Sequence, residues 1–279
     1  MQVGCHLSVA KGFAGAARKA PLLGATAFQY FGKNPRSLRP SRPPDPEDTL
    51  RGRALVGERG LLTVVHAAYL INLCAADDEM RAVAVASLVQ ELEFAHTRGT
   101  PFVVVHCGKY TSLGKAEGER IMREAVAQVL HEADFPDVTL LLENTAGQGT
   151  ELGTDPDELM GFMDESPQRL GICYDTCHAF AAGVLDPMAP ERAPGVRDPA
   201  FWARVRVVHL NDSMGAMGSR RDRHARIGQG AIGVEGMTRI LHTPAFRERP
   251  IIVETPVDRE DEYAAEIAQV HRLAGGAPA

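Results

Sequence analysis

Eight short apolar runs recur along the 279-residue chain, and amphipathic stretches with helical spacing lie between them. The runs are rich in Val, Ile and Leu, and most of them end in a polar or ionisable residue. Continuous apolar runs of this length are typical of parallel strands buried on both faces, with helices as the crossover connections. The runs cover residues 2–8, 25–34, 62–73, 101–108, 138–147, 169–179, 205–212 and 249–256.

This alternation predicts an α/β fold, a (β/α)8 TIM barrel that forms a single domain over residues 1–279. Apolar residues at spacings of three and four predict helices at 77–98, 115–133 and 259–273. A doubly wound parallel sheet is the main alternative. Three polar or Pro-rich segments, at 36–48, 185–200 and 212–233, are expected to be long loops, and loops of this length are usually functional or disordered.

The residues that close the third to eighth runs are all possible metal ligands: His66, His106, Glu143, Asp175, His209 and Glu254. In a barrel the C-terminal strand ends converge on one face, which carries the active site. Because side chains alternate along a strand, the residues two positions earlier should also point into the barrel and pack below the ligands. These are Val64, Val104, Leu141, Cys173, Val207 and Ile252.

Three further candidates join this set: His178 lies three residues after Asp175, and Asp222 and His224 alternate in the long seventh loop. Nitrogen and oxygen donors together suit zinc, with manganese or iron as alternatives. Nine ligands exceed the needs of one ion, so two or three ions are expected, arranged to activate water for attack on phosphorus or a carbonyl. Any single histidine could instead have a packing role, and Glu143 could form a structural ion pair.

The cysteines and the overall charge limit the choice of function. Cys173 and Cys177 are spaced like zinc ligands, but there is no second pair, and an odd total of five argues against a disulfide framework. The chain begins without a targeting peptide and has no apolar run long enough for a membrane helix, so a cytoplasmic protein with reduced thiols is expected. A net charge of −6, taken alone, argues against a nucleic-acid partner.

Several longer motifs carry a family resemblance that covers nearly the whole chain. They are GCHLSVAKG, FGKNPR at 31–36, HAAYLINL at 66–73, LENTAGQG at 142–149, DTCHAFAAG at 175–183, HLNDS at 209–213, GSRRDRHARIGQG at 218–230 and VETP at 253–256. In these motifs the chain resembles the endonuclease IV family of apurinic/apyrimidinic endonucleases.

The resemblance implies a three-zinc TIM-barrel DNA repair enzyme that cuts the backbone 5′ to an abasic site, leaves a 3′-hydroxyl and removes 3′-blocking groups. It assigns the first zinc to His66, His106 and Glu143. Glu143 would bridge to the second zinc, which Asp175, His209 and Glu254 also hold. The third zinc is assigned to His178, Asp222 and His224. A hydroxide between the first two zincs would attack phosphorus, while the third stabilises the departing oxygen. Cys173 and Cys177 would then be packing residues.

The resemblance also suggests how double-stranded DNA is held by a monomeric enzyme. Asn34, Arg36, Tyr69 and Leu70 match family positions that contact DNA or fill the gap at the damage, and Arg223 and Arg226 are further candidates for phosphate contacts. Three zinc ions would change the formal charge of the site to about +2 and that of the chain from −6 to about 0. The charge objection to DNA is thereby removed.

The chain departs from the usual family pattern at positions that are not ligands. Val65 and Cys107 occupy positions where family members usually have proline. Family members also commonly have a lysine near the position of Met214 and an aromatic residue near that of Leu38. Cys107 could make the site sensitive to oxidation, although a packed, inert thiol is the favoured interpretation.

Two other functions fit parts of the pattern. A sugar isomerase or epimerase on the same barrel would also place carboxylates and histidines at strand ends, but it needs only one or two ions, so His178, Asp222 and His224 would be surplus. A non-catalytic, zinc-dependent binder of damaged DNA belongs to a different class, and substitution of Glu143 by Gln would separate it from the enzymes.

Overall fold

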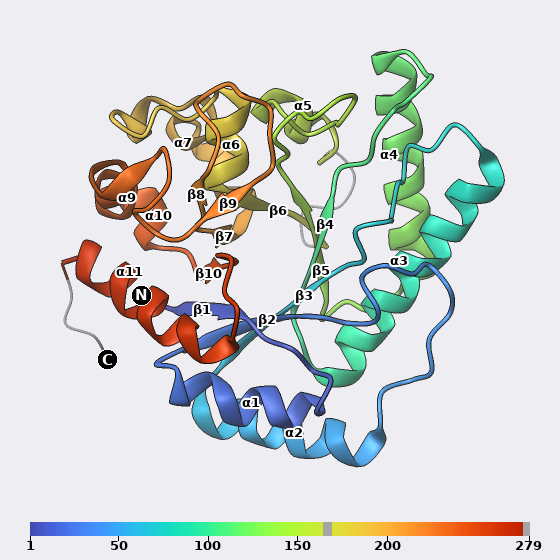
Figure 1. Cartoon of the computed structure of the whole chain (residues 1–279). Coiled ribbons are helices and arrows are strands. Elements are labelled where there is room, and N and C mark those ends of the chain that lie inside the picture. Colours follow the sequence, from blue (N-terminus) through green and yellow to red (C-terminus); the bar gives the residue numbers. More distant parts are fainter. Residues whose placement is uncertain (164–168, 276–279) are drawn as a thin grey trace.

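The computed structural model describes residues 1–163 and 169–275, which form a closed barrel of parallel strands surrounded by helices (Figure 1). The order around the barrel is β1-β10-β7-β6-β5-β4-β3-β2, and every pairing between these strands is parallel. The predicted TIM barrel is confirmed and the doubly wound sheet is excluded. The barrel strands are β1 (Val3–His6), β2 (Ala27–Phe31), β3 (Leu62–His66), β4 (Phe102–His106), β5 (Thr139–Glu143), β6 (Leu170–Asp175), β7 (Val205–His209) and β10 (Ile251–Val253).

The helices pack around the outside of the barrel, and their ends follow local capping rules (Figure 1). Asp77 accepts a hydrogen bond from the backbone of Met80, and Gly99 ends the same helix in the left-handed conformation. The expected helices at 77–98 and 115–133 are present with boundaries one residue shorter. The main helices are α1 (Phe13–Leu22), α2 (Pro46–Arg59), α3 (Asp78–Arg98), α4 (Lys115–Glu132), α5 (Pro156–Gly161), α6 (Thr176–Ala182), α9 (Gly233–His242) and α11 (Tyr263–Leu273).

The three expected loops contain more structure than the sequence pattern predicts. Segment 36–48 runs into α2, which begins at Pro46, and segment 185–200 holds three short helices that each begin at a proline, a residue suited to the first helical turn. The expected helix at 259–273 begins as a separate 3-10 turn. The short elements are η1 (Pro190–Arg192), α7 (Pro194–Arg197), α8 (Pro199–Arg204), α10 (Pro244–Arg247), η2 (Glu260–Glu262) and the antiparallel pair β8 (Asp212–Ser213) and β9 (His224–Ala225).

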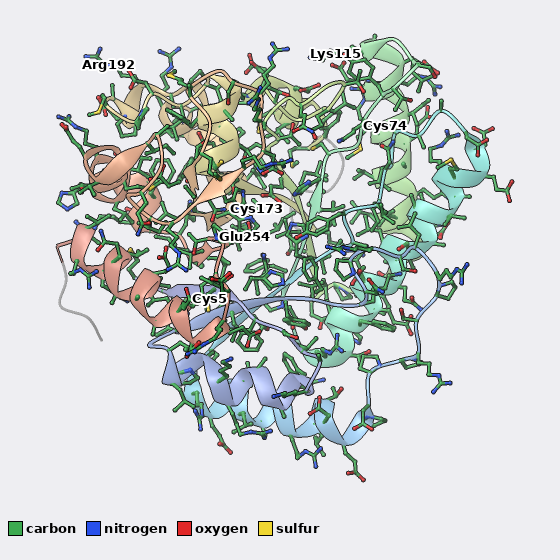
Figure 2. All side chains as sticks on the ribbon, viewed as in Figure 1. Cys5, Cys74, Lys115, Cys173, Arg192 and Glu254 are labelled. Carbon is green, nitrogen blue, oxygen red and sulfur yellow. The ribbon has the colours of Figure 1, made fainter. Side chains whose placement is uncertain are left out.

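A small apolar layer fills the barrel interior and is separate from the larger core between strands and helices. Its members are fully buried, and they are the six residues expected from strand alternation together with Ala27 of β2. Cys173 and Glu254 both lie near the centre of the molecule in Figure 2. The layer consists of Ala27, Val64, Val104, Leu141, Cys173, Val207 and Ile252.

Within the described residues, no helix combines the length and the apolar character needed to cross a membrane.

Candidate metal centre

Six candidate ligands lie at the C-terminal ends of consecutive barrel strands. His66, His106, Glu143, Asp175 and His209 are the last residues of β3 to β7, and Glu254 directly follows β10. The strand register places His106 beside Glu143 and Asp175 beside His209. The six side chains therefore meet above the apolar layer, as expected for the active face of a barrel.

The other three candidates reach the same place from a helix and from the β8–β9 segment. The Asp175 carboxylate caps α6 by accepting a hydrogen bond from the backbone nitrogen of His178 at 2.7 Å, which fixes the start of the helix. His178 Nε2 then lies 3.2 Å from Asp222 Oδ1, and His224 Nε2 lies 3.4 Å from the same oxygen. These contacts complete a cluster of all nine predicted residues.

The nine residues form three groups in which the possible ligand atoms lie within 4.8 Å of one another. The first group is His66, His106 and Glu143; the second is Glu143, Asp175, His209 and Glu254; the third is His178, Asp222 and His224. These are the groupings that the family resemblance implies, and Glu143 belongs to two of them.

The two carboxylate oxygens of Glu143 face different groups. Oε2 lies 3.3 Å from His66 Nε2 and 3.1 Å from His106 Nε2. Oε1 lies 2.9 Å from His209 Nδ1, on the other side. Glu143 is fully buried. This arrangement suits a carboxylate that bridges two cations.

Hydrogen bonds to backbone carbonyls orient three of the histidine rings. His66 Nδ1 donates to Ala67 O at 2.8 Å, and His178 Nδ1 donates to Asn144 O at 2.8 Å. His224 Nδ1 donates to Glu254 O at 3.4 Å. Each ring therefore turns its Nε2 lone pair towards the carboxylates. Such outer contacts are characteristic of metal-binding histidines.

The buried polar atoms of the centre test whether cations fit there. Glu143 Oε2, His178 Nε2 and His224 Nε2 are buried without a hydrogen-bond partner, although each lies close to polar atoms of its own group. A buried polar atom without a partner is costly, and cations bound within the separate groups would satisfy all three atoms. The donor set of imidazoles and carboxylates fits zinc.

The charges of the centre favour ionised carboxylates. Burial opposes ionisation of Glu143, but the rings of His209 and His106 outweigh it and hold the pKa of Glu143 well below its usual value. Burial also opposes protonation of His178, yet the carboxylates of Asp175 and Asp222 raise its pKa well above the usual value. Protons and cations therefore compete for the same histidine nitrogens.

The two neighbouring cysteines are buried in the packing around the centre. The Cys173 sulfur lies within 4.8 Å of possible ligand atoms of Glu143 and His209. The Cys177 sulfur lies within the same distance of Asp175 and His224. Burial raises the pKa of each thiol to about 12. Cys173 belongs to the apolar layer, and Cys177 Sγ donates to Arg223 O at 3.7 Å, so both thiols have contacts within the protein packing.

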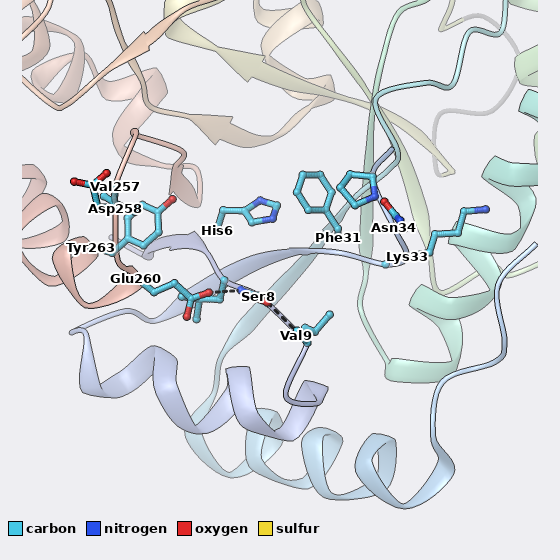
Figure 3. A pocket seen from close by; sticks show the side chains of 14 residues that line it. His6, Ser8, Val9, Phe31, Lys33, Asn34, Val257, Asp258, Glu260 and Tyr263 are labelled. Carbon is cyan, nitrogen blue, oxygen red and sulfur yellow. Dashed lines mark hydrogen bonds between the residues drawn. The ribbon is translucent and has the colours of Figure 1, made fainter. Parts of the chain in front are cut away.

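The centre is closed from below and open to one side. The open side is a cavity of about 330 Å³ that His66, His106, Glu254, Tyr69 and Arg223 help to line. A second pocket of about 500 Å³ lies beside it, between the loops that follow β1, β2 and β10 (Figure 3). His6, Phe31, Asn34 and Tyr263 line this second pocket.

Comparison with known proteins identifies the family. A family model described as xylose isomerase-like TIM barrel matches residues 17–273. The probable endonuclease 4 of Symbiobacterium thermophilum is 46% identical over 281 residues, which cover 98% of this chain and 99% of that protein. Endonuclease 4 of Thermus thermophilus is 42% identical over 269 residues and 93% of each chain.

The chain belongs to the endonuclease IV family. A crystal structure of endonuclease IV from Thermus thermophilus has a TM-score of 0.87 at 39% identity and covers 99% of both chains. Membership of the endonuclease IV family confirms the predicted enzyme class, a DNA-cleaving hydrolase. A D-tagatose 3-epimerase-like protein has a TM-score of 0.69 at 19% identity, with 99% of this chain and 98% of that chain covered, and this likeness shows the fold alone.

Two of the positions that resemble DNA-contacting residues of the endonuclease IV family, Tyr69 and Arg223, line the open side of the centre. Tyr69 and Leu70 are more than half exposed, at 58% and 54%, and Asn34 and Arg36 lie in the exposed loop after β2. Arg223 is exposed at the edge of the cavity. Arg226 is half-buried and forms an ion pair with Glu262, so it has a protein partner for its charge.

The departures from the usual family pattern fit the packing. Val65 is fully buried, and Cys107 is 2% exposed with a thiol pKa that burial raises well above the usual value. Met214 is 71% exposed, and Leu38 packs at the edge of the core. Cys107 therefore has the environment of an inert thiol, in agreement with the favoured interpretation.

Four polar residues of the centre were not predicted from the sequence: His6, Gln29, Asn144 and Asn211. Asn211 Nδ2 donates to Asp175 Oδ2 at 2.6 Å and to Glu254 Oε2 at 3.3 Å. Asn144 holds the Asp175 backbone through both its amide atoms. Gln29 was visible as a polar residue within the apolar run AFQYF, the signal that could have identified it.

Proposed function

We propose that the chain is a zinc-dependent DNA repair endonuclease. It hydrolyses the phosphodiester bond on the 5′ side of an abasic site, leaves a 3′-hydroxyl for base excision repair and removes 3′-blocking groups. The observation that carries the proposal is the position of Glu143, whose two oxygens face two histidine groups within one continuous cluster. A carboxylate in that position suits a centre of several closely spaced ions.

Three zinc ions per chain match the three groups of possible ligands. Zinc bound there would supply Lewis-acid chemistry, which activates water, polarises a phosphoryl oxygen and stabilises charge on the leaving oxygen. The protein itself holds the nine ligands, with Glu143 shared between the first two groups. Manganese or iron could replace zinc in part, because the donors are imidazoles and carboxylates.

The residues around the cavity would position damaged DNA over the centre. Tyr69 and Leu70 project as an exposed aromatic and aliphatic pair beside His106, which suits insertion at an unstacked position of the duplex. An abasic sugar has no base to unpair, so its displacement costs less than that of an intact nucleotide. Arg223 at the cavity edge, and Asn34 and Arg36 in the β2 loop, would contact the backbone.

A sugar isomerase is disfavoured by the third group. His178, Asp222 and His224 would have no role in an enzyme that needs one or two ions, yet their side chains converge. A binder of damaged DNA that lacks catalysis would keep the whole centre and is distinguished only by experiment.

The test is nicking of an end-labelled duplex that carries one tetrahydrofuran abasic analogue. We expect cleavage 5′ to the analogue, a product that a polymerase can extend, loss of cleavage after prolonged chelation and recovery with added zinc. The same duplex without the analogue is the control and should stay intact. Binding of the duplex without cleavage by metal-replete protein would support the non-catalytic binder instead.

Two further predictions concern the state of the protein. A monomer is expected in solution, which sedimentation of the zinc-loaded protein would check. A cytoplasmic location is expected for an enzyme of chromosomal DNA repair, and cell fractionation would check it.

A further inference from the structure

Two barrel strands contribute no predicted ligand, and the polar side chains that they place at the centre pair with each other. Gln29 is fully buried in the middle of β2. His6 is the last residue of β1, and the strand register sets it beside Gln29. Gln29 lies two positions after Ala27 of the apolar layer, so it points inward at the level of the ligands.

The amide of Gln29 makes three contacts, two of them with residues of the second group. Its Oε1 lies 2.8 Å from His209 Nε2, and its Nε2 lies 2.6 Å from Glu254 Oε1. The same Nε2 lies 3.2 Å from His6 Nδ1. Both amide atoms are therefore used, and Gln29 links the His6 ring in the second pocket to two candidate ligands. Figure 3 shows His6 projecting beside Phe31 in that pocket.

These contacts determine the amide orientation and the tautomer of His209. A flipped amide would place its oxygen against the Glu254 carboxylate, and two acceptors repel each other. With the oxygen towards His209, Nε2 of the ring must carry the hydrogen, because a carbonyl oxygen only accepts. His209 Nδ1 is then the ring atom left to bind a cation, and it lies 2.9 Å from Glu143 Oε1 and 3.1 Å from Glu254 Oε2.

Gln29 also restrains Glu254. One carboxylate oxygen of Glu254 accepts from Gln29, and the other lies 3.3 Å from the Asn211 amide and 3.1 Å from the His209 ring. Two neutral amides therefore hold the carboxylate in one orientation without adding charge. Glu254 is the most exposed residue of the second group, with 15% of its side chain exposed. Its side chain would therefore be the least restrained of the group without these hydrogen bonds.

We propose that Gln29 is a positioning residue that sets the affinity of the second group, namely Glu143, Asp175, His209 and Glu254, for its cation. This inference rests on the proposed metal function. Loss of outer contacts to metal ligands typically weakens metal binding by about 10–100-fold. No other described barrel residue bonds to both His209 and Glu254 from a strand without a ligand of its own.

The experiment compares wild type with Gln29→Met, which keeps the side-chain length but removes all three contacts, and with Gln29→Ala. Gln128→Met, at an exposed glutamine on α4, is the matched control. Zinc content and affinity are measured by chelator competition, and the melting temperature is measured with and without zinc. We expect both Gln29 variants to hold one zinc about 10–100-fold more weakly, while Gln128→Met binds like wild type.

The zinc-dependent rise in melting temperature separates positioning from packing. A positioning role reduces this rise, because weaker binding stabilises the folded state less. A packing role lowers the melting temperature equally with and without zinc. Cleavage provides a second readout: kcat should fall at limiting zinc, while KM for the abasic duplex changes by less than about threefold.

The outcomes separate this inference from the proposed function. Unchanged zinc affinity in both Gln29 variants, with a melting temperature lowered equally in the presence and absence of zinc, would show that Gln29 serves packing alone. If wild type binds three zinc ions and cuts the duplex, and the Gln29 variants do the same equally well, only the proposed role of Gln29 is overturned. Wild type that binds no zinc overturns the proposed function itself.

Discussion

Two layers of side chains lie inside the same barrel, two residues apart on the same strands, and they differ in polarity and charge. The lower layer is apolar and fully buried, with Val64, Val104 and Leu141 among its members. The upper layer carries His66, His106 and Glu143 from the same three strands. The lower layer stabilises the fold, whereas the upper layer buries ionisable groups, which costs free energy unless partners satisfy them.

The comparison shows that strand periodicity alone can place a packed floor beneath a reactive centre. Because every second residue of a strand points inward, the residue two positions after a member of the lower layer lies in the upper layer. The floor packs beneath the charged layer, which the cavity at its side reaches. Substitutions in the two layers should therefore affect different quantities.

The largest expected effect is on catalysis, from Glu143→Gln in the upper layer. The amide removes the charge and one of the two oxygens that face the histidine groups. Cleavage of the abasic duplex should fall at least about a thousandfold, or about 4 kcal/mol in activation free energy. Single-turnover assays measure this change, with circular dichroism as the control for folding. Retention of a tenth of the wild-type rate would contradict a bridging role.

The next effect is on stability, from Leu141→Ala in the lower layer. Loss of a buried leucine should lower the free energy of unfolding by about 2–5 kcal/mol, because the barrel interior cannot fully collapse around the cavity. Urea titration of the zinc-loaded protein measures it. Activity per folded molecule should remain within about threefold of wild type. A variant that stays stable but loses cleavage would mean that the two layers are not separable.

A smaller effect is expected above both layers, from Tyr69→Ala. Tyr69 is 58% exposed and its ring packs edge-on against Phe31 at 5.2 Å, so its loss should hardly change stability. Binding of an abasic duplex should weaken by about 1–3 kcal/mol, the usual contribution of one stacked base. Fluorescence anisotropy with Tyr69→Phe as control checks this. Equal weakening by both variants would assign the role to the hydroxyl instead.

The smallest effect is expected beside the upper layer, from Cys107→Ala. The thiol is buried and its pKa lies well above the usual value because of burial, so it is protonated at neutral pH. Cleavage should be unchanged, and stability should fall by only about 1 kcal/mol. Mild peroxide treatment should affect wild type and variant alike. Protection of the variant alone would reveal a reactive thiol at this position.

The parts of the molecule that repeat a pattern could be predicted from the sequence. The barrel, the apolar floor and the candidate ligands at the strand ends all follow from runs that end in an ionisable residue. The exact ligand groups came from the family resemblance, since spacing alone left two or three ions open. The placement of Asp222 and His224 beside His178 agrees with the alternation of these residues in the loop and with the family resemblance.

Residues without a distinctive pattern could not be predicted. Asn144 and Asn211 are neutral amides in polar segments, and an amide there gives no sign of whether it will face water or a candidate ligand. The strands β8 and β9 have two residues each, too few to show any alternation. The short helices at 190–204 begin at prolines, which also mark loops, so the sequence favoured the wrong alternative there.

The closure of the barrel has a consequence for the synthesis of the chain. β1 pairs with β10, the last barrel strand, and Glu254 directly follows β10. Gln29, near the start of the chain, bonds to Glu254 near its end. A growing polypeptide that has not yet released residues beyond 254 from the ribosome therefore lacks the complete second group. The candidate metal centre can therefore assemble only in a chain that has been synthesised through β10 and Glu254.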